Sequence, residues 1–212
     1  GIFEIDVLRE GEPMHELATP AGTPNPIVVG SRIVTALDAR NRELAASPLE
    51  YVGPESVFLG IATGGDFYNR FPTAFHIVGT RRYSPERSYD EVRDEIAALI
   101  RRATGIAPNE DSGPLRIVFR LQKVKDGYRI SADAPIAQAV SEAYRLVNGR
   151  RLRPGGSSVV ADGPLFVNEA GVTAVCHGPS GRGAHADIEW IDLDELVRIA
   201  REYVVAALLY LR

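Results

Sequence analysis

The sequence predicts a mixed α/β protein in two parts, an α+β unit followed by a segment of α/β type. Short runs in which apolar residues alternate with polar ones predict strands, and stretches with apolar residues every three or four positions predict helices between them. After residue 127 the rhythm changes, and helical stretches alternate with short runs of small residues. We therefore predict one unit over residues 1–127 and a second over residues 128–212.

The first predicted strand and helix lie near the start of the chain. Ile2 to Arg9 mixes apolar residues with acidic and basic ones, which is typical of a half-buried strand. The pair Asn25-Pro26 predicts a helix start, because asparagine caps the first free amide groups and proline suits the first turn. The apolar face of this helix consists of Ile27, Ile33, Val34, Leu37 and Leu44.

Three more strands and a second helix complete the first unit. Ser56–Ala62 and Thr73–Gly79 are strand candidates. The run Ser-Tyr-Asp-Glu that begins at Ser88 is a capping box, so a helix should start there and end at Gly105. In Leu115–Gln122 apolar and polar residues alternate, which predicts one more strand.

The predicted order of the first unit is therefore β-α-β-β-α-β, the split-βαβ or ferredoxin-like arrangement. Such a unit has an antiparallel sheet with both helices on one face. Its open edge or open face is free to meet a partner. We expect this unit to pair with its own copy, so that the protein is a homodimer.

Residues 128–212 carry fewer strand signals than the first unit. The predicted elements are a helix at Pro135–Val147, a strand and turn at Ser157–Gly163, a short helix at Leu165–Ala170, a strand at Val172–Cys176 and a helix at Asp192–Leu211. These strands are too few to form a parallel sheet covered on both faces. We expect this segment to be part of a domain whose other part is absent from this chain.

Composition narrows the class of protein. The net charge of −4 and the lack of a block of like charge argue against a nucleic-acid partner. No apolar run approaches 18 residues and no basic-then-apolar leader is present, so we expect no membrane span and no secretion. The single cysteine, Cys176, excludes an internal disulfide and predicts a reducing, cytoplasmic location; its apolar neighbours predict a buried strand position.

The glycine-rich stretch 178–191, GPSGRGAHADIEWI, is the most distinctive local pattern. Its glycines allow the backbone to pass close to a ligand, and the loop presents one imidazole, that of His185. With an apolar run before it and a helix after it, the pattern is typical of a ligand loop beyond a strand end. A solvated loop histidine is the alternative interpretation.

Several separate motifs now occur in one order: Glu12-Pro13-Met14-His15, Asn25-Pro26-Ile27, Asn69 with Pro72, Arg82 in Gly-Thr-Arg-Arg-Tyr, Ala161-Asp162-Gly163, and Gly183-Ala184-His185 four residues before Glu189. In this set the chain resembles the di-zinc amidohydrolases and peptidases that include carboxypeptidase G, acetylornithine deacetylase, aminoacylase and β-alanine synthase. The likeness covers essentially all 212 residues.

The resemblance implies a role for each half of the chain. Residues 1–127 would be a ferredoxin-like dimerisation (lid) domain, and residues 128–212 the C-terminal portion of an α/β zinc-hydrolase domain. His15 would act at the other subunit's active site, where it donates to the oxyanion of the reaction. Asn69 and Arg82 would lie together and bind the substrate carboxylate, and His185 would hold one of two divalent metals, zinc or alternatively cobalt or manganese. The implied substrate is an N-acyl or N-carbamoyl amino acid or a small dipeptide.

The sequence also departs from the family pattern. Glu16 stands where Ser or Thr is usual after the lid histidine, and the N-terminal His-x-Asp, bridging aspartate and Glu-Glu pair are absent before Gly1. Because zinc needs three or four protein ligands, we expect the isolated chain to be inactive and a separate N-terminal half to be a partner. The alternative is a non-catalytic dimerisation or amino-acid-binding module, in which Arg82 is surface charge and His15 a solvated histidine.

Overall fold

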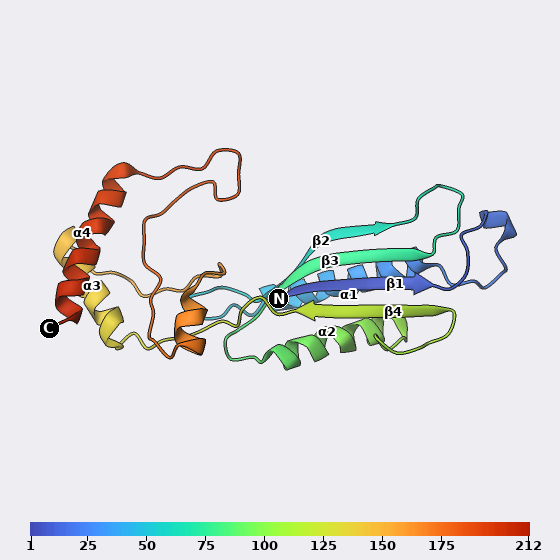
Figure 1. The fold of residues 1–212 in the computed structure, drawn as a ribbon, viewed down its shortest axis with the longest axis horizontal. Helices are drawn as coiled ribbons and strands as arrows, with labels where there is room; N and C mark the ends of the chain where they lie inside the picture. The colour runs from blue at the N-terminus through green and yellow to red at the C-terminus, as the bar shows by residue number, and fades with distance from the viewer. The chain divides into compact units, whose positions relative to one another are not determined.

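The computed structural model describes residues 1–212, which separate into two compact units, Gly1–Gly127 and Tyr128–Arg212 (Figure 1). The first unit contains all four strands of the structure, and the second contains helices and long irregular segments. Measured by length and hydropathy, no helix of the chain qualifies as membrane-spanning.

The first unit is a four-stranded antiparallel sheet with two long helices. Along the chain its elements are β1 (Ile2–Arg9), α1 (Pro26–Ala45), β2 (Ser56–Gly64), β3 (Ala74–Arg82), α2 (Tyr89–Thr104) and β4 (Leu115–Gln122) (Figure 1). The strand order in the sheet is β2-β3-β1-β4, and every neighbouring pair is antiparallel. The predicted β-α-β-β-α-β order and the mixed α/β class are confirmed, although β2 and β3 both extend beyond their predicted ends.

The core of this unit forms between one face of the sheet and both helices. Alternate residues of β1, namely Phe3, Ile5 and Val7, are fully buried, and Ile5 lies opposite Ile77 of β3 and Phe119 of β4. Burying each such side chain contributes about 1.5–3 kcal/mol. The helix residues in the same cluster are Ile33, Leu37, Leu44, Val92, Ile96, Leu99 and Ile100.

The helix ends follow the predicted capping chemistry. The Asn25 Oδ1 accepts a hydrogen bond of 2.9 Å from the Ile27 amide at the start of α1. Ser88 and Glu91 make the reciprocal bonds of a capping box at the start of α2. Gly105 ends α2 with φ +76°, a left-handed conformation that glycine adopts without strain.

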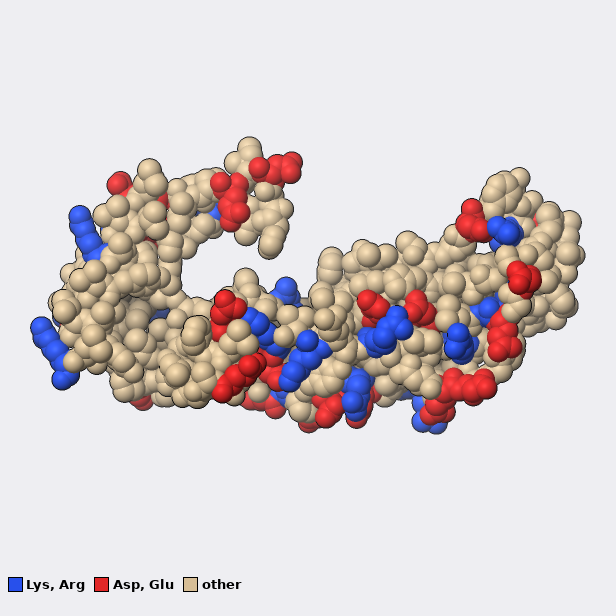
Figure 2. All heavy atoms as spheres, viewed as in Figure 1, with Lys and Arg blue, Asp and Glu red and all other residues tan.

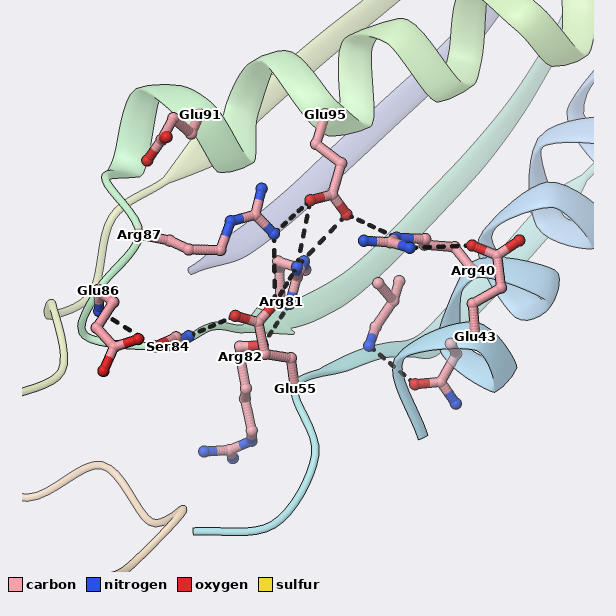
Figure 3. A network of polar contacts seen from close by, with 12 residues as sticks. Arg40, Glu43, Glu55, Arg81, Arg82, Ser84, Glu86, Arg87, Glu91 and Glu95 are labelled. Atoms are coloured by element: carbon pink, nitrogen blue, oxygen red, sulfur yellow. Dashed lines mark hydrogen bonds and ion pairs between the residues drawn. The ribbon is translucent and has the colours of Figure 1, made fainter. Parts of the chain in front are cut away.

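A buried ionic network ties the end of β3 to both helices (Figure 3). The side chain of Arg81 is fully buried, and its Nη2 lies 2.6 Å from the Glu55 carboxylate and 3.4 Å from that of Glu95. Glu95 of α2 also pairs with Arg87 at 2.5 Å and with Arg40 of α1 at 3.0 Å. Three guanidinium groups thus share two carboxylates, so each carboxylate has more than one cationic neighbour.

The network keeps both carboxylates ionised. Burial alone would raise the pKa of Glu55, but the hydrogen bond from the Ser84 amide and the contacts with Arg81 and Arg87 outweigh it and lower the pKa below 4.5. For Glu95, burial is likewise outweighed by Arg40, Arg81 and Arg87, so its pKa is also lowered. Both groups therefore stabilise the fold above pH 4.5, and this contribution is lost as the pH falls through their lowered pKa values.

Replacing Glu95 by Gln should destabilise the first unit at pH 7 by about 2–3 kcal/mol, because hydrogen bonds to charged groups are lost. The difference from the wild type should shrink as the pH falls below 4.5, where the wild-type carboxylates become protonated. Urea unfolding followed by circular dichroism at several pH values measures both effects. Glu43→Gln is the matched control, because Glu43 pairs with the same Arg40 on the exposed surface. A difference in unfolding free energy between the wild type and Glu95→Gln that stays constant with pH would contradict this assignment.

The second unit is built on two packed helices, α3 (Pro135–Asn148) and α4 (Leu193–Tyr210), with a five-residue π-helical turn at Leu165–Glu169. Gly149 ends α3 with φ +70°, and Asp192 caps α4 through a 2.9 Å bond from the Glu195 amide. Both helices occur close to where the sequence predicts them.

Two strands that the sequence predicts in this unit do not form. The segments 157–163 and 172–176 are irregular, and Cys176 is exposed rather than buried. A strand requires a neighbouring strand to accept and donate its ladder hydrogen bonds, and the second unit offers none. Several apolar side chains of α4 are also exposed, namely Leu193, Leu196, Val197, Val204 and Leu208.

Candidate functional site

Two predicted site residues, His15 and Asn69, meet at one end of the first unit. His15 precedes the short 3-10 helix Glu16–Ala18, and its chain segment pairs with the loop between β2 and β3. Two backbone bonds hold the segments together, from the Glu16 amide to the Asn69 carbonyl at 3.0 Å and from the Phe71 amide to the Met14 carbonyl at 2.8 Å. The side chains then meet, with the His15 Nε2 3.1 Å from the Asn69 Nδ2.

The hydrogen bonds of His15 indicate how its ring is protonated. Its Nδ1 accepts a 3.2 Å hydrogen bond from the Leu17 amide. A neutral imidazole has one acceptor nitrogen and one N–H donor, so the proton lies on Nε2. The Asn69 amide group therefore turns its oxygen, rather than its nitrogen, toward that donor. The Nε2–H of His15 thus donates to the Asn69 side chain, which holds the imidazole in place.

An open cavity of about 550 Å³ lies next to Asn69, and His15 is not part of its lining. Its lining includes Asn69, Glu16, Asn25, Phe67 and Tyr68. The rings of Phe67 and Tyr68 lie 4.6 Å apart, and both are largely exposed. The volume falls in the range of small-molecule sites, and the lining combines aromatic rings with a few polar groups.

Arg82 lies far from Asn69 in the same chain. It is the last residue of the nine-residue strand β3, whereas Asn69 precedes the first residue of that strand. At ~3.3 Å per residue the strand alone separates them by about 26 Å. The expectation that the fold brings Asn69 and Arg82 together is therefore wrong for a single chain, because β3 runs straight between them. Their roles in substrate binding stay predictions.

His185 lies in a loop of the second unit that is closed by backbone hydrogen bonds. Arg182 and Trp190 exchange two backbone hydrogen bonds of 3.0 Å, and the Arg182 guanidinium lies 5.4 Å from the centre of the Trp190 ring. Gly183 has φ +77°, and a Cβ there would come within 2.1 Å of the Ile188 carbonyl oxygen, so only glycine fits. His185 itself adopts φ +65°, and its side chain is exposed.

The residues of this chain do not make a complete metal site. Across residues 1–212 no group of three or more His, Cys, Asp or Glu side chains is arranged to hold a metal ion. Tight zinc binding requires three or four protein ligands. His185 is thus at most one ligand of a site that other groups would complete.

The sequence analysis missed a buried polar cluster in the second unit. The Nε2 of His177 lies 2.6 Å from one carboxylate oxygen of Glu202, and the Asn148 amide donates a 2.6 Å bond to the other. Glu202 is only 2% exposed. The burial of Glu202 could have been predicted from the sequence, because Ile199, Glu202 and Ala206 follow helical spacing and form the buried face of α4.

Comparison with known proteins identifies the first unit. Residues 1–107 match the family model of the peptidase dimerisation domain of M20 peptidases, which is half of the chain. None of the curated proteins compared with the chain is significantly similar to it.

Solved structures share the fold over almost all of the chain. An M20 family metallo-carboxypeptidase from Sulfolobus solfataricus matches with a TM-score of 0.70 and 17% identity, over 99% of this chain and 58% of its own. A tripeptidase from Staphylococcus aureus has a TM-score of 0.72 and 15% identity, over 100% and 52%. A dinuclear metal-binding M20 peptidase from Bacillus subtilis has a TM-score of 0.64 and 16% identity, over 99% and 49%.

The chain thus spans about half the length of these structures. At this low sequence identity the structural likeness shows the fold alone, and it agrees with the antiparallel sheet and the two helices of the first unit. The family follows from the match over residues 1–107, which contain His15, Asn69 and Arg82. The chain belongs to the M20 peptidase family, through its peptidase dimerisation domain.

Proposed function

We propose that this chain supplies the dimerisation unit and the C-terminal segment of a metal-dependent hydrolase that cleaves an amide bond. The substrate would be an N-acyl or N-carbamoyl amino acid or a small dipeptide. The observation that carries the proposal is the contact between His15 and Asn69, which lie 54 residues apart in the sequence, with Asn69 also lining a cavity. Structures of the same fold include a carboxypeptidase and a tripeptidase, which supports a peptide or peptide-like substrate.

In this proposal the first unit provides the polar groups that bind the substrate. The Nε2–H of His15 would donate to the oxygen that becomes negatively charged in the reaction, as preorganised donors do. Before the substrate binds, the Asn69 oxygen would accept this N–H and hold the imidazole; once the N–H turns to the reacting oxygen, Asn69 would be free to contact the substrate carboxylate. The Arg82 guanidinium would bind the same carboxylate through two parallel hydrogen bonds.

A second copy of the chain would bring Asn69 and Arg82 to the same end of a joined sheet. In β2, Ser56 lies opposite Arg82, and Gly64 lies near the loop that carries Asn69. If two β2 strands pair about a two-fold axis, they run antiparallel, so the start of one strand lies beside the end of the other. Arg82 of one chain and the partner subunit's Asn69 then lie at the same end.

The two edges of the sheet differ in a way that favours pairing through β2. The edge at β4 is sealed, because Asn109 bonds to the Ile117 carbonyl at 2.8 Å and to both backbone groups of Phe119 at 2.9 Å. The edge at β2 carries Phe58 and Ile61, which are 63% and 49% exposed. Charged atoms gather away from this edge, over β4 and α2 (Figure 2). An exposed apolar strand edge pairs readily with another strand.

Replacing Ile61 by Lys should convert the dimer to a monomer at micromolar concentration, because it places two like charges near the two-fold axis and removes apolar contact. Light scattering coupled to size-exclusion chromatography measures the mass. Gln122→Lys adds the same charge at the exposed end of the sealed edge and should leave the dimer intact. A wild-type chain that is strictly monomeric would count against the pairing.

His185 would be one metal ligand of the complete enzyme. Two divalent metals, zinc or alternatively cobalt or manganese, would polarise the amide carbonyl and supply a hydroxide nucleophile. The remaining ligands would come from polypeptide that this chain does not contain, the N-terminal half of the catalytic domain. The exposed apolar side chains of α4 support this, since such a surface is usually covered.

The purified 212-residue chain should not hydrolyse N-acyl amino acids or dipeptides, with or without zinc, because His185 is at most one of the three or four ligands that zinc requires. Adding a separately produced N-terminal half should restore zinc-dependent hydrolysis. The readouts are product release and the metal content of the complex. Zinc-dependent turnover by the chain alone would contradict this assignment.

The second candidate is a non-catalytic module that dimerises or binds an amino acid, in which His185 has no role. The position of His185 favours it, because that side chain belongs to no group of three or more possible metal ligands. Metal analysis separates the two candidates: an assembled hydrolase should hold about two metals per site, and a binding module none. The single cysteine suits a cytoplasmic location for either.

A further inference from the structure

We infer that His177 and Glu202 are positioning residues that hold the loop carrying His185 against α4. The inference rests on the proposed function of His185 as a metal ligand. In the proposed function, neither His177 nor Glu202 binds the substrate or a metal. The loop runs from residue 178 to residue 191 and begins directly after His177.

The contact between His177 and Glu202 is a largely buried polar interaction of the second unit. The side chains are 12% and 3% exposed, and the Nε2 of His177 lies 2.6 Å from the Glu202 carboxylate. The rings of Tyr144 and Tyr203 approach the imidazole edge-on, at 6.3 and 6.0 Å between ring centres. The two tyrosines and the carboxylate therefore fix the position of the imidazole.

Further contacts fasten the same end of the loop to α4. The Tyr203 hydroxyl donates a 2.5 Å bond to the His177 carbonyl, and the Glu195 carboxylate accepts a 3.0 Å bond from the Ser180 amide. The far end of the loop joins α4 directly at its cap, Asp192. Both ends of the loop are thus attached to α4. Between them, the backbone pairing of Arg182 with Trp190 closes a hairpin.

The arrangement explains why a charged residue lies on the buried face of α4. A buried carboxylate is costly unless it is hydrogen-bonded. Glu202 has two partners, Asn148 on α3 and His177 at the loop, one for each oxygen. The Asn148 contact joins the two helices, whereas the His177 contact joins helix to loop. Replacing Asn148 therefore tests the packing of the two helices, and replacing His177 tests the positioning of the loop.

The test uses the full 212-residue chain and its only tryptophan, Trp190, which lies within the loop. In His177→Ala the loop should open more often, because a hydrogen bond to a charged group is lost. Trypsin should then cut after Arg182 about 10- to 100-fold faster than in the wild type. Trp190 fluorescence should shift as the Arg182 contact loosens. His177→Gln, which retains an N–H donor, should restore slow cleavage, and Asn148→Ala should leave the loop unchanged.

Equal cleavage and fluorescence in the wild type and His177→Ala would overturn the inference, as would an equal change in Asn148→Ala. If His177→Ala does not fold, Glu202→Gln replaces it, with the same expected result. A second measurement follows metal loss to a chelator in the complex with the N-terminal half. Faster loss from His177→Ala supports the positioning role, and unchanged loss overturns it. A wild-type complex without metal would overturn the proposed function, while the loop measurements would still decide whether His177 anchors the loop.

Discussion

The antiparallel pairing of β1 with β3 is the constraint on which the first unit depends. It buries the alternate side chains Phe3, Ile5 and Val7 against both helices, and it fixes β3 as a straight rod through the middle of the sheet. One end of that rod carries the loop with Asn69, which meets His15. The other end carries Arg81, buried among carboxylates, and then Arg82. The sheet therefore places two sets of polar side chains at opposite ends, and the proposed pairing of two β2 strands would combine them across two chains.

The second unit is organised by different forces. It has no sheet, and its two helices α3 and α4 leave apolar side chains exposed. Hydrogen bonds to side chains of α4 replace strand pairing as the means of fixing a loop, since Glu195 and Glu202 accept from the segment that leads to His185. A fixed loop that presents a single potential ligand is of little use alone, because a metal requires several ligands at once. In the proposed function this loop would supply one metal ligand, and further polypeptide would supply the others.

Local chemistry explains how far the sequence could predict this structure. Asn25, Ser88 and Gly105 mark helix ends by hydrogen bonds within a few residues, and the alternation in Leu115–Gln122 needs only one buried face, so these elements were predictable. The segment 172–176 has a strand-like composition, but a strand also needs a neighbour, which the sequence of the segment does not reveal. The Arg81 network and the Glu202 cluster join residues far apart in sequence, so only the fold brings them together. For the same reason the sequence predicted His15 and Asn69 separately without predicting their contact.

The central claim is that His15 acts in the active site of the partner chain, whereas His185 binds metal in the active site of its own chain. Mixed dimers test it, in the complex with the N-terminal half. One population carries His15→Ala and the other His185→Ala, and each alone should be inactive. After random mixing, half of the dimers are mixed and each has one intact site of two, so about a quarter of the wild-type activity should return. No recovery, with mixed dimers demonstrated by mass spectrometry, would contradict the account.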